Sequence, residues 1–239
     1  MKYFILTGAS RGIGESICEK LLLKDHHVIC VSRKRNDSLI SLANSRNAKL
    51  DYFEYDLSNL YVIEELMRKI FEKVDSSVAE SLFLINNAGL VFSQKIEETE
   101  PGSIINLMNV NLLSPMILTS SFIKHAEQYD VEKRILNVSS GSSFNLSPGG
   151  SCYSTSKAGL ETFTKSIGIE TEYEDLKNFA DVDYNNLKKN KDSGAIYRTL
   201  SISEYLKVYT RSSLDGYRRT KRDKKDQSKI EVLNELLHD

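Results

Sequence analysis

The chain has 239 residues, of which 40% are hydrophobic and 27% charged, and its formal net charge is −1 at pH 7. This length fits one α/β domain with a sizeable core and excludes a second large domain. Because charges of both signs are spread along the chain, the balance predicts no polyelectrolyte partner, so we expect neither nucleic acid nor a membrane surface to be bound.

The cysteines and histidines exclude two further kinds of protein. Cys18, Cys30 and Cys152 show no CxxC spacing, which favours a reducing compartment over a disulfide scaffold. The four histidines lack metal-ligand spacing, so we expect no metal site. The first expected strand starts at Tyr3, without room for a leader, and no apolar run approaches membrane-spanning length. We therefore expect a cytoplasmic protein.

The first segment of the chain is a strand, a glycine turn and a helix. Residues 3–6 are apolar without alternation, which is typical of a strand buried in a parallel sheet, and an amphipathic helix is expected from Gly12 onward. Gly8 permits a tight exit from the strand, Gly12 leaves room for a pyrophosphate, and Gly14 lets the helix lie close to the sheet. The pattern predicts dinucleotide binding, with a plain structural turn as the alternative. The candidate cofactor-binding residues here are Gly8, Ser10, Arg11, Gly12, Ile13 and Gly14.

The second strand, expected at His27–Ser32, ends in the basic run Arg33-Lys34-Arg35. In a dinucleotide fold an acid at this point favours the free ribose 2′-hydroxyl, whereas a basic residue favours a 2′-phosphate. There is no acid, and Arg11 and Arg33 could both bind a 2′-phosphate bidentately. We therefore expect NADP(H) rather than NAD(H), although a solvated basic loop is an alternative.

A helix over about 38–47 and a third strand at Leu50–Leu57 follow. Asp56 could accept a hydrogen bond from the adenine amino group, and Asp56 or Ser58 could instead cap the helix that starts near Leu60. We count Asp56 and Leu57 as candidate cofactor-binding residues.

The fourth strand, Leu82–Ile85, leads into Asn86-Asn87-Ala88-Gly89. Side-chain amides at a strand end can satisfy neighbouring backbone groups, while the small Ala88 and Gly89 let a cofactor ribose pass close. An Asn-rich turn is the alternative. We favour a binding role for Asn87, Ala88 and Gly89, because this strand should adjoin the first one, at the switch point where ligands bind.

A helix that opens at Pro101 should be interrupted near Asn111, because Pro115 lies in the first turn of the next helical stretch. A buried amide at Asn111 needs partners. These are either backbone and water alone or a water chain that leads to an active-site lysine.

The fifth strand, Arg134–Ser140, precedes a loop rich in Ser, Gly and Asn at Ser142–Cys152, which we expect to be exposed and to face the substrate. Tyr153 and Lys157 open the next helix. Residues four apart share a helix face, so the ammonium should lower the pKa of the phenol and make it a useful acid or base. An isolated pair of this kind would be a helix-opening aromatic residue and a solvated lysine.

Five motifs together resemble those of the short-chain dehydrogenase/reductase family: Thr7-Gly8-x-x-x-Gly12-Ile13-Gly14, Asn86-Asn87-Ala88-Gly89, Asn111, Ser140 and Tyr153-x-x-x-Lys157. Within the family, three segments are most similar to bacterial benzil reductases that form (S)-benzoin: 84–89, 111–120 and 133–141. The resemblance implies a doubly wound, Rossmann-like parallel sheet with helices on both faces, a homodimer, and NADPH-dependent reduction of one carbonyl of an α-diketone.

The resemblance also implies a role for each catalytic residue. Tyr153 protonates the carbonyl oxygen, and Lys157 lowers the pKa of Tyr153 and holds the nicotinamide ribose hydroxyls. Ser140 hydrogen-bonds the carbonyl, and Asn111 holds the water of a proton relay. Donors placed where negative charge develops on oxygen stabilise the transition state.

The resemblance covers residues 1–168 and then stops. Residues 171–239 hold 14 Lys+Arg and 13 Asp+Glu, and no proline follows Pro148, whereas the family has a Pro-Gly loop after its sixth strand. We expect a strand at Ala195–Ile202, a poorer strand pattern at Phe179–Tyr184, and a short helix over 230–237. The segment is a diverged sheet edge, the product of a reading-frame slip, or part of a protein that binds cofactor without turnover.

We thus expect one dinucleotide-binding catalytic domain over residues 1–239, with 169–239 diverged or aberrant. Its predicted activity is the NADPH-dependent reduction of a small carbonyl substrate. A catalytically silent NADP(H)-binding protein and a short-chain dehydrogenase acting on a different ketone or alcohol are the alternatives.

Overall fold

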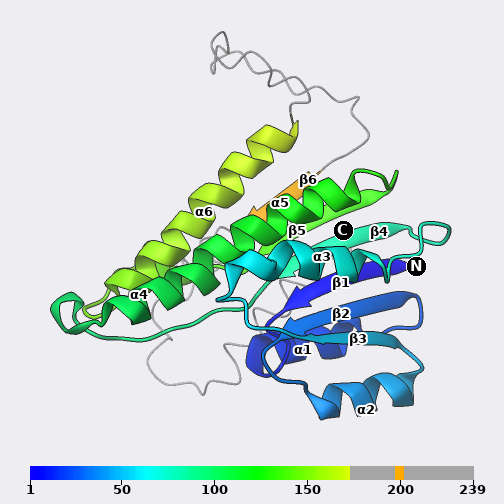
Figure 1. Ribbon diagram of the computed structural model, residues 1–239, viewed down its shortest axis with the longest axis horizontal. Coiled ribbons are helices and arrows are strands. Elements are labelled where there is room, and N and C mark those ends of the chain that lie inside the picture. The colour runs from blue at the N-terminus through cyan, green and yellow to red at the C-terminus, as the bar shows by residue number, and fades with distance from the viewer. Residues whose placement is uncertain (173–196, 202–239) are drawn as a thin grey trace, which may run out of the picture.

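A computed structural model describes residues 1–172 and 197–201 of the chain, and in it six parallel strands form one sheet in the order β3-β2-β1-β4-β5-β6 (Figure 1). The expectation of a doubly wound parallel sheet is confirmed. The strands are β1 Lys2–Thr7, β2 His26–Ser32, β3 Lys49–Glu54, β4 Ser81–Asn86, β5 Glu132–Asn137 and β6 Tyr197–Ser201. The strand order reverses between β1 and β4, so the switch point lies where the glycine turn and the Asn-Asn-Ala-Gly segment meet.

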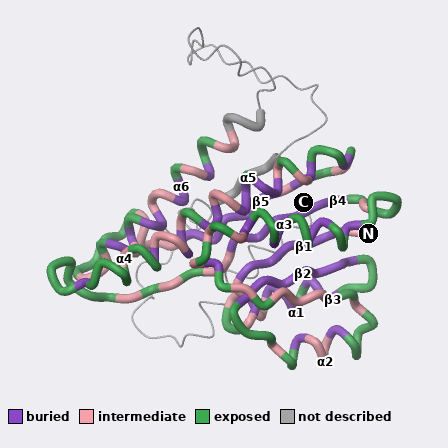
Figure 2. The backbone as a smooth tube through the Cα atoms, viewed as in Figure 1, coloured by how far each residue is buried: buried purple, intermediate pink, exposed green. Residues whose placement is uncertain are grey.

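Helices cover both faces of the sheet, and the strands β1, β2 and β4 are almost entirely buried, whereas the edge strand β3 is only partly buried (Figure 2). On one face, α1 and α2 pack against Phe4 and Leu6; on the other, α3 and α5 pack against Tyr3 and Ile5. The helices are α1 Gly12–Leu21, α2 Asp37–Arg46, α3 Ile63–Phe71, α4 Pro101–Met108, α5 Ser114–Ala126 and α6 Ser151–Glu172. Continuous apolar strands form because both faces of a parallel sheet are covered.

The start of α3 differs from the prediction. A 3-10 turn, η1 Leu60–Val62, precedes α3, and no side-chain cap bond is made at Asn59 or Val62. The Asp56 carboxylate instead accepts a hydrogen bond from the Ser58 backbone N–H at 2.9 Å, which closes a local turn just after β3. The alternative in which Asp56 or Ser58 caps this helix is therefore wrong, because the local turn uses the groups that a cap would need.

The interruption predicted near Asn111 is confirmed. A π-helical turn, η3 Asn109–Leu113, separates α4 from α5, and each of these helices has a proline in its first turn. Single π-helical turns place side chains off the regular helical face and are frequent at functional sites.

The combined stretch Pro101–Ala126 is long and apolar enough to cross a membrane by length and composition. The expectation that no apolar run approaches that length was therefore too simple. In the fold, this stretch packs against α3, α6 and the strands β4 and β5.

One part of the charged C-terminal region lies within the described residues. The strand expected at Ala195–Ile202 is present as β6, which pairs in parallel with β5 in the register Lys133↔Tyr197. The expectations for Phe179–Tyr184 and for a helix over 230–237 fall outside the described residues.

A chain of buried amides links β4, β5 and α6. Asn86 Nδ2 donates to Asn137 Oδ1 at 2.8 Å, and Asn137 Nδ2 donates to Thr164 Oγ1 at 2.9 Å. All three residues are at most 2% exposed. The chain fixes α6 over the sheet, because a misplaced helix would leave buried amide groups without partners.

We expect Asn137→Ala to lower the free energy of unfolding by about 2–4 kcal/mol, since it leaves an amide donor of Asn86 poorly paired and opens a cavity. Urea unfolding measures the change. Asn145→Ala, at an exposed loop asparagine, is the matched control and should change stability by less than about 0.5 kcal/mol. A loss at Asn137 no larger than the control's would show that the amide chain does not hold α6.

Candidate active site

The glycine turn between β1 and α1 has the geometry that close packing requires. Gly8 has φ +75°, and a Cβ added to it would lie 2.8 Å from the Ala88 Cα. A Cβ on Gly14 would lie 2.2 Å from the Gly8 carbonyl oxygen, so α1 reaches the strand end only because residue 14 has no side chain. Gly12 has φ +61°, and among the described residues no atom lies within 4 Å of its Cβ position, so these residues leave space above the helix N-terminus.

Thr7 joins the two strand ends at the switch point. Its hydroxyl accepts hydrogen bonds from the backbone N–H groups of Asn87 and Ala88, both at 3.0 Å. The Asn87 side-chain amide donates back to the Thr7 carbonyl at 3.0 Å and to the Gly8 carbonyl at 3.3 Å. The expected pairing of an amide with neighbouring backbone groups is therefore present, and Ala88 and Gly89 follow directly from it.

The remaining residues of the glycine turn are held by Asn36. Its side chain donates to the Ser10 carbonyl at 3.1 Å and to the Glu15 carboxylate at 2.7 Å, while its Oδ1 caps α2 by accepting from Leu39 N–H. Ile13 packs at the edge of the apolar cluster between α1 and the sheet. The turn is thus fixed at both ends, by Thr7 on one side and Asn36 on the other.

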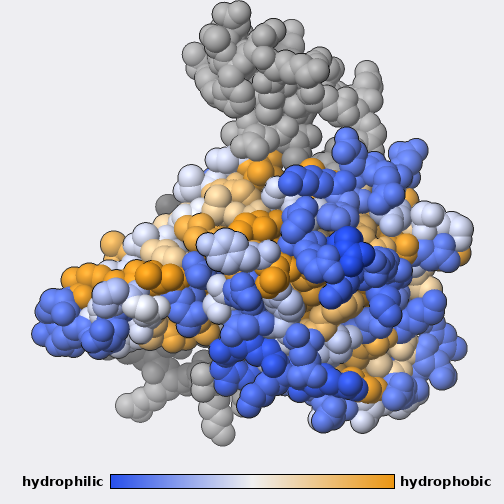
Figure 3. Space-filling view, in the orientation of Figure 1, coloured by the Kyte–Doolittle hydropathy of each residue, from blue (hydrophilic) through white to orange (hydrophobic). Residues whose placement is uncertain are grey.

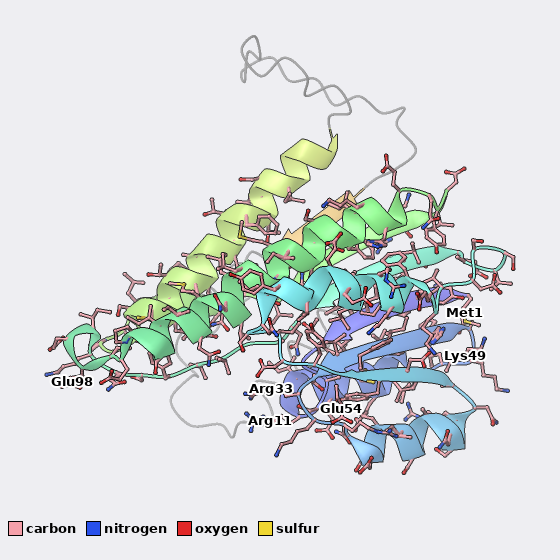
Figure 4. The ribbon with its side chains drawn as sticks, viewed as in Figure 1. Met1, Arg11, Arg33, Lys49, Glu54 and Glu98 are labelled. Atoms are coloured by element: carbon pink, nitrogen blue, oxygen red, sulfur yellow. The ribbon has the colours of Figure 1, made fainter. Side chains whose placement is uncertain are left out.

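The two arginines expected at a 2′-phosphate lie at the carboxyl end of the sheet, away from Met1 and Lys49 at its other end (Figure 4). Arg11 is the residue before α1 and Arg33 follows β2, and both are exposed. Within residues 1–172 and 197–201, neither guanidinium has a carboxylate within 4.0 Å. Two cations without close counter-ions beside an open helix N-terminus suit an anionic group.

Asp56 and Leu57 have different environments. The Ser58 backbone N–H, the Ser58 side chain and the nearby Arg33 charge hold the pKa of Asp56 below its usual value, so this exposed carboxylate stays ionised. Leu57 is only 5% exposed and packs in the core on the α3 and α5 side. Asp56 therefore lies at the surface near Arg33, and Leu57 lies in the core.

Tyr153 and Lys157 lie one turn apart in the first two turns of α6. Lys157 is 4% exposed, and its ammonium donates to the Val138 carbonyl at 2.9 Å. The same Nζ lies 3.7 Å from the Cβ position of Gly89, so the lysine reaches across to the end of β4. Tyr153 is half-buried, and its hydroxyl has no hydrogen-bond partner among the described residues. The ammonium of Lys157 therefore lies near the switch point, and Tyr153 shares its helix face one turn before it.

Asn111 is fully buried in the π-helical turn. Its Oδ1 accepts from Leu90 N–H at 2.7 Å, and its Nδ2 donates to the Leu90 carbonyl at 2.8 Å and to Ser156 Oγ at 3.1 Å. These bonds occupy both amide hydrogens. Asn111 Oδ1 and Lys157 Nζ also lie 3.5 and 3.7 Å from the Cβ position of Gly89, so both side chains reach the same glycine.

Ser140 ends the turn after β5. Its Oγ accepts from Ser142 N–H at 3.3 Å, and no acceptor for its hydroxyl hydrogen is present in the described part of the chain. One lone pair is therefore used to fix the oxygen, while the O–H stays available to donate.

Sequence reasoning missed Glu161, one turn beyond Lys157 on α6. Its carboxylate, 8% exposed, accepts from Ser139 Oγ at 2.9 Å and from Ser143 Oγ, and these two serines flank Ser140. Glu161 thus holds the turn that carries Ser140. The signal was present, because Tyr153, Lys157 and Glu161 follow one another at four-residue spacing.

A pocket of about 540 Å³ lies beside this site, between α6, the loop after β5 and the segment Lys95–Glu97. Its α6 residues include Thr155 and Ala158, which face a different side of the helix from Tyr153 and Lys157. The loop expected to face the substrate lines it through Leu146–Gly149. The pocket is therefore separate from the phenol and ammonium.

The residues present fit a bound dinucleotide. The open space above Gly12, the close approach at Gly14 and the two arginines form a cradle that a side chain at Gly12 would fill. No group of three or more His, Cys, Asp or Glu residues in the described ranges could hold a metal ion.

Comparisons with known proteins give consistent results. The family model described as "short chain dehydrogenase" matches residues 2–177. A benzil reductase ((S)-benzoin forming) from Bacillus cereus is 39% identical over 177 residues, which cover 72% of this chain and 71% of that protein. The enzyme of the same name from Bacillus subtilis is 34% identical over 177 residues, covering 74% and 70%.

Among solved structures, the alcohol dehydrogenase from the archaeon Thermococcus sibiricus, complexed with 5-hydroxy-NADP, is similar with a TM-score of 0.63 and 25% identity. The similarity covers 71% of each chain.

Proposed function

The chain belongs to the short chain dehydrogenase family of oxidoreductases, and from this premise we propose that it is an NADPH-dependent carbonyl reductase that reduces one carbonyl of an α-diketone such as benzil, giving (S)-benzoin. The observation that carries the proposal is the buried Lys157 ammonium near the switch point, with Tyr153 on the same face of α6, together with 39% identity to a benzil reductase. The NADP(H) assignment is supported by Arg11 and Arg33, which have no carboxylate within 4.0 Å among the described residues, and by a structural relative bound to an NADP derivative.

In this proposal each side chain has a task that its contacts allow. NADPH, when bound, supplies the hydride that reduces the carbonyl carbon. Tyr153 donates its proton to the carbonyl oxygen, and the Ser140 hydroxyl donates a hydrogen bond to the same oxygen, where negative charge develops. Lys157, already oriented by the Val138 carbonyl, holds the nicotinamide ribose hydroxyls. Asn111 fixes a water that returns a proton towards Lys157, beside Gly89.

The cofactor contacts are assigned in the same way. The N-terminal amides of α1 bind the pyrophosphate above Gly12, flanked by Ser10 and Ile13, and Gly8 and Gly14 give the turn its shape. Asn87, Ala88 and Gly89 line the path of the nicotinamide ribose. Asp56 accepts from the adenine amino group, and Leu57 supports that position from the core.

The decisive experiment is an assay with purified protein, NADPH and benzil, with cofactor absorbance and chiral analysis of the benzoin formed. We expect oxidation of NADPH and formation of (S)-benzoin. Thermal stabilisation by NADPH without turnover of any diketone or quinone would show a silent NADP(H)-binding protein. Turnover of other ketones or alcohols but not of benzil would show a different substrate on the same scaffold.

Arg33→Ala should weaken NADPH binding about 10- to 100-fold and leave NADH binding within about twofold, because it removes a charge-assisted contact to the 2′-phosphate only. Fluorescence titration with both cofactors measures the two dissociation constants. Arg35→Ala, in the same basic loop but beside Asp37, is the matched control. An equal effect on NADPH from both variants would show that only the overall positive charge of the loop matters.

We also propose a cytoplasmic homodimer. Apolar side chains gather over the helices α4, α5 and α6 (Figure 3), and Ile105 and Leu113 are exposed there. Sedimentation of the purified protein tests this assembly, and a single monomeric species at micromolar concentration would contradict it.

A further inference from the structure

Three oxygen atoms meet behind the basic loop that follows β2. Ser32 Oγ and Tyr52 OH lie 2.5 Å apart, and each lies 3.0 Å from the Lys34 carbonyl oxygen. Tyr52 comes from β3, in the register position opposite Cys30, so its phenol reaches past the end of β2 to the loop. The contact joins the third strand to the loop that carries Arg33.

The hydrogen count fixes how this cluster is bonded. Two hydroxyls carry two hydrogens, and the carbonyl can only accept. Because the two hydroxyl oxygens lie only 2.5 Å apart, one hydroxyl donates to the other, which donates to the Lys34 carbonyl. Hydrogen bonds in such a chain strengthen one another. Burial raises the pKa of Tyr52, so the phenol keeps its hydrogen at neutral pH and remains a donor.

The hydrogen bonds among Ser32, Tyr52 and the Lys34 carbonyl hold the loop 33–35 in place. Among the described residues, Lys34 makes no hydrogen bond other than those to its carbonyl. Within the same residues, the backbones of Arg33 and Arg35 make none. The loop is anchored before it by Ser32, which is 6% exposed, and after it by the cap residue Asn36. Without the hydrogen bonds to the Lys34 carbonyl, the backbone groups of residues 33–35 would be bonded to water alone.

We propose that Tyr52 is a positioning residue for cofactor choice: its hydroxyl fixes the Lys34 carbonyl and thereby directs Arg33 at the ribose 2′-phosphate. This inference rests on the proposed NADP(H) function. The Lys34 carbonyl belongs to the peptide that follows Lys34, one residue beyond Arg33. Fixing this peptide lowers the entropy that the loop loses when it binds a phosphate, a gain that only the phosphorylated cofactor receives. The phenol thus favours NADP(H) without touching it.

The test is Tyr52→Phe, which removes one oxygen and keeps the ring. We expect NADPH to bind about 5-fold more weakly and NADH to bind within about twofold of the unmodified protein, so the ratio of the two dissociation constants falls. Fluorescence titration gives both constants, and the thermal unfolding midpoint shows whether the variant is folded.

Tyr55→Phe is the matched control. It removes a hydroxyl near the same strand end that packs towards the other face of the sheet and has no hydrogen-bond partner in the described residues. Both affinities should remain unchanged in it.

The inference and the proposed function fail in different ways. If the unmodified protein prefers NADPH and Tyr52→Phe keeps that preference, or loses affinity for both cofactors equally, Tyr52 does not direct cofactor choice. If the unmodified protein binds NADPH no better than NADH, the NADP(H) assignment itself is wrong and the inference falls with it.

Discussion

Tyr153→Phe should lower the turnover number by about 10²- to 10⁴-fold, the range expected when a general acid is removed. The dissociation constant for NADPH should change by less than about threefold. The phenol has no hydrogen-bond partner among the described residues, so the variant loses a proton donor without stranding another buried group. Steady-state kinetics with benzil and a cofactor titration separate the two quantities.

Two other variants sharpen this result. Tyr61→Phe makes the same change at a side chain that is 98% exposed and should leave turnover unchanged. Lys157→Met should reduce both turnover and cofactor affinity, because the ammonium is assigned to the ribose as well as to the phenol. If Tyr153→Phe lost cofactor affinity as severely as turnover, the phenol would be part of the binding surface and not the proton donor.

The fold could be predicted because local pattern and global topology agree in the first two thirds of the chain. Continuous apolar runs such as residues 3–6 allow only buried strands, and the glycines that follow allow only a tight turn into a helix. The placement of β4 beside β1 followed from the strand order of a dinucleotide-binding fold. β6 was found inside a highly charged segment, because its own residues still favour a strand.

The parts that sequence reasoning missed are contacts between residues far apart in the chain. Glu161 looks like an ordinary helix residue until the turn after β5 places Ser139 and Ser143 against it. From the sequence Tyr52 is an ordinary aromatic residue of a strand, and only the structure shows its hydroxyl at the Lys34 carbonyl. Spacing shows which residues share one element, whereas these contacts depend on how two elements pack.

The capping alternative considered for Asp56 before α3 is also absent, here because of a local contact. Asp56 is a good capping residue type, but its carboxylate closes a turn with the Ser58 N–H two residues on. Short polar side chains offer the backbone several local partners, and the sequence does not rank them.

Gly14→Ala tests whether the site depends on the close approach of α1 to the sheet. By helix propensity alone, alanine at this helical position should stabilise the protein by about 0.5–1 kcal/mol. The structure predicts the opposite sign. The new Cβ would lie 2.2 Å from the Gly8 carbonyl oxygen and 2.5 Å from Asn87 Nδ2, and the backbone atom cannot move without displacing the strand end.

We therefore expect Gly14→Ala to lower the free energy of unfolding by about 1–3 kcal/mol or more, the usual cost of overpacking. NADPH affinity should fall more than about 100-fold, because α1 must shift away from the strand end and its N-terminal amides move with it. Gly89→Ala is the matched control for stability, since its Cβ would meet no atom closer than 3.5 Å. Urea unfolding and cofactor titration measure both effects. A stabilised Gly14→Ala that still binds NADPH would mean that α1 does not need this contact, and the cradle assigned to the pyrophosphate would lose its main structural support.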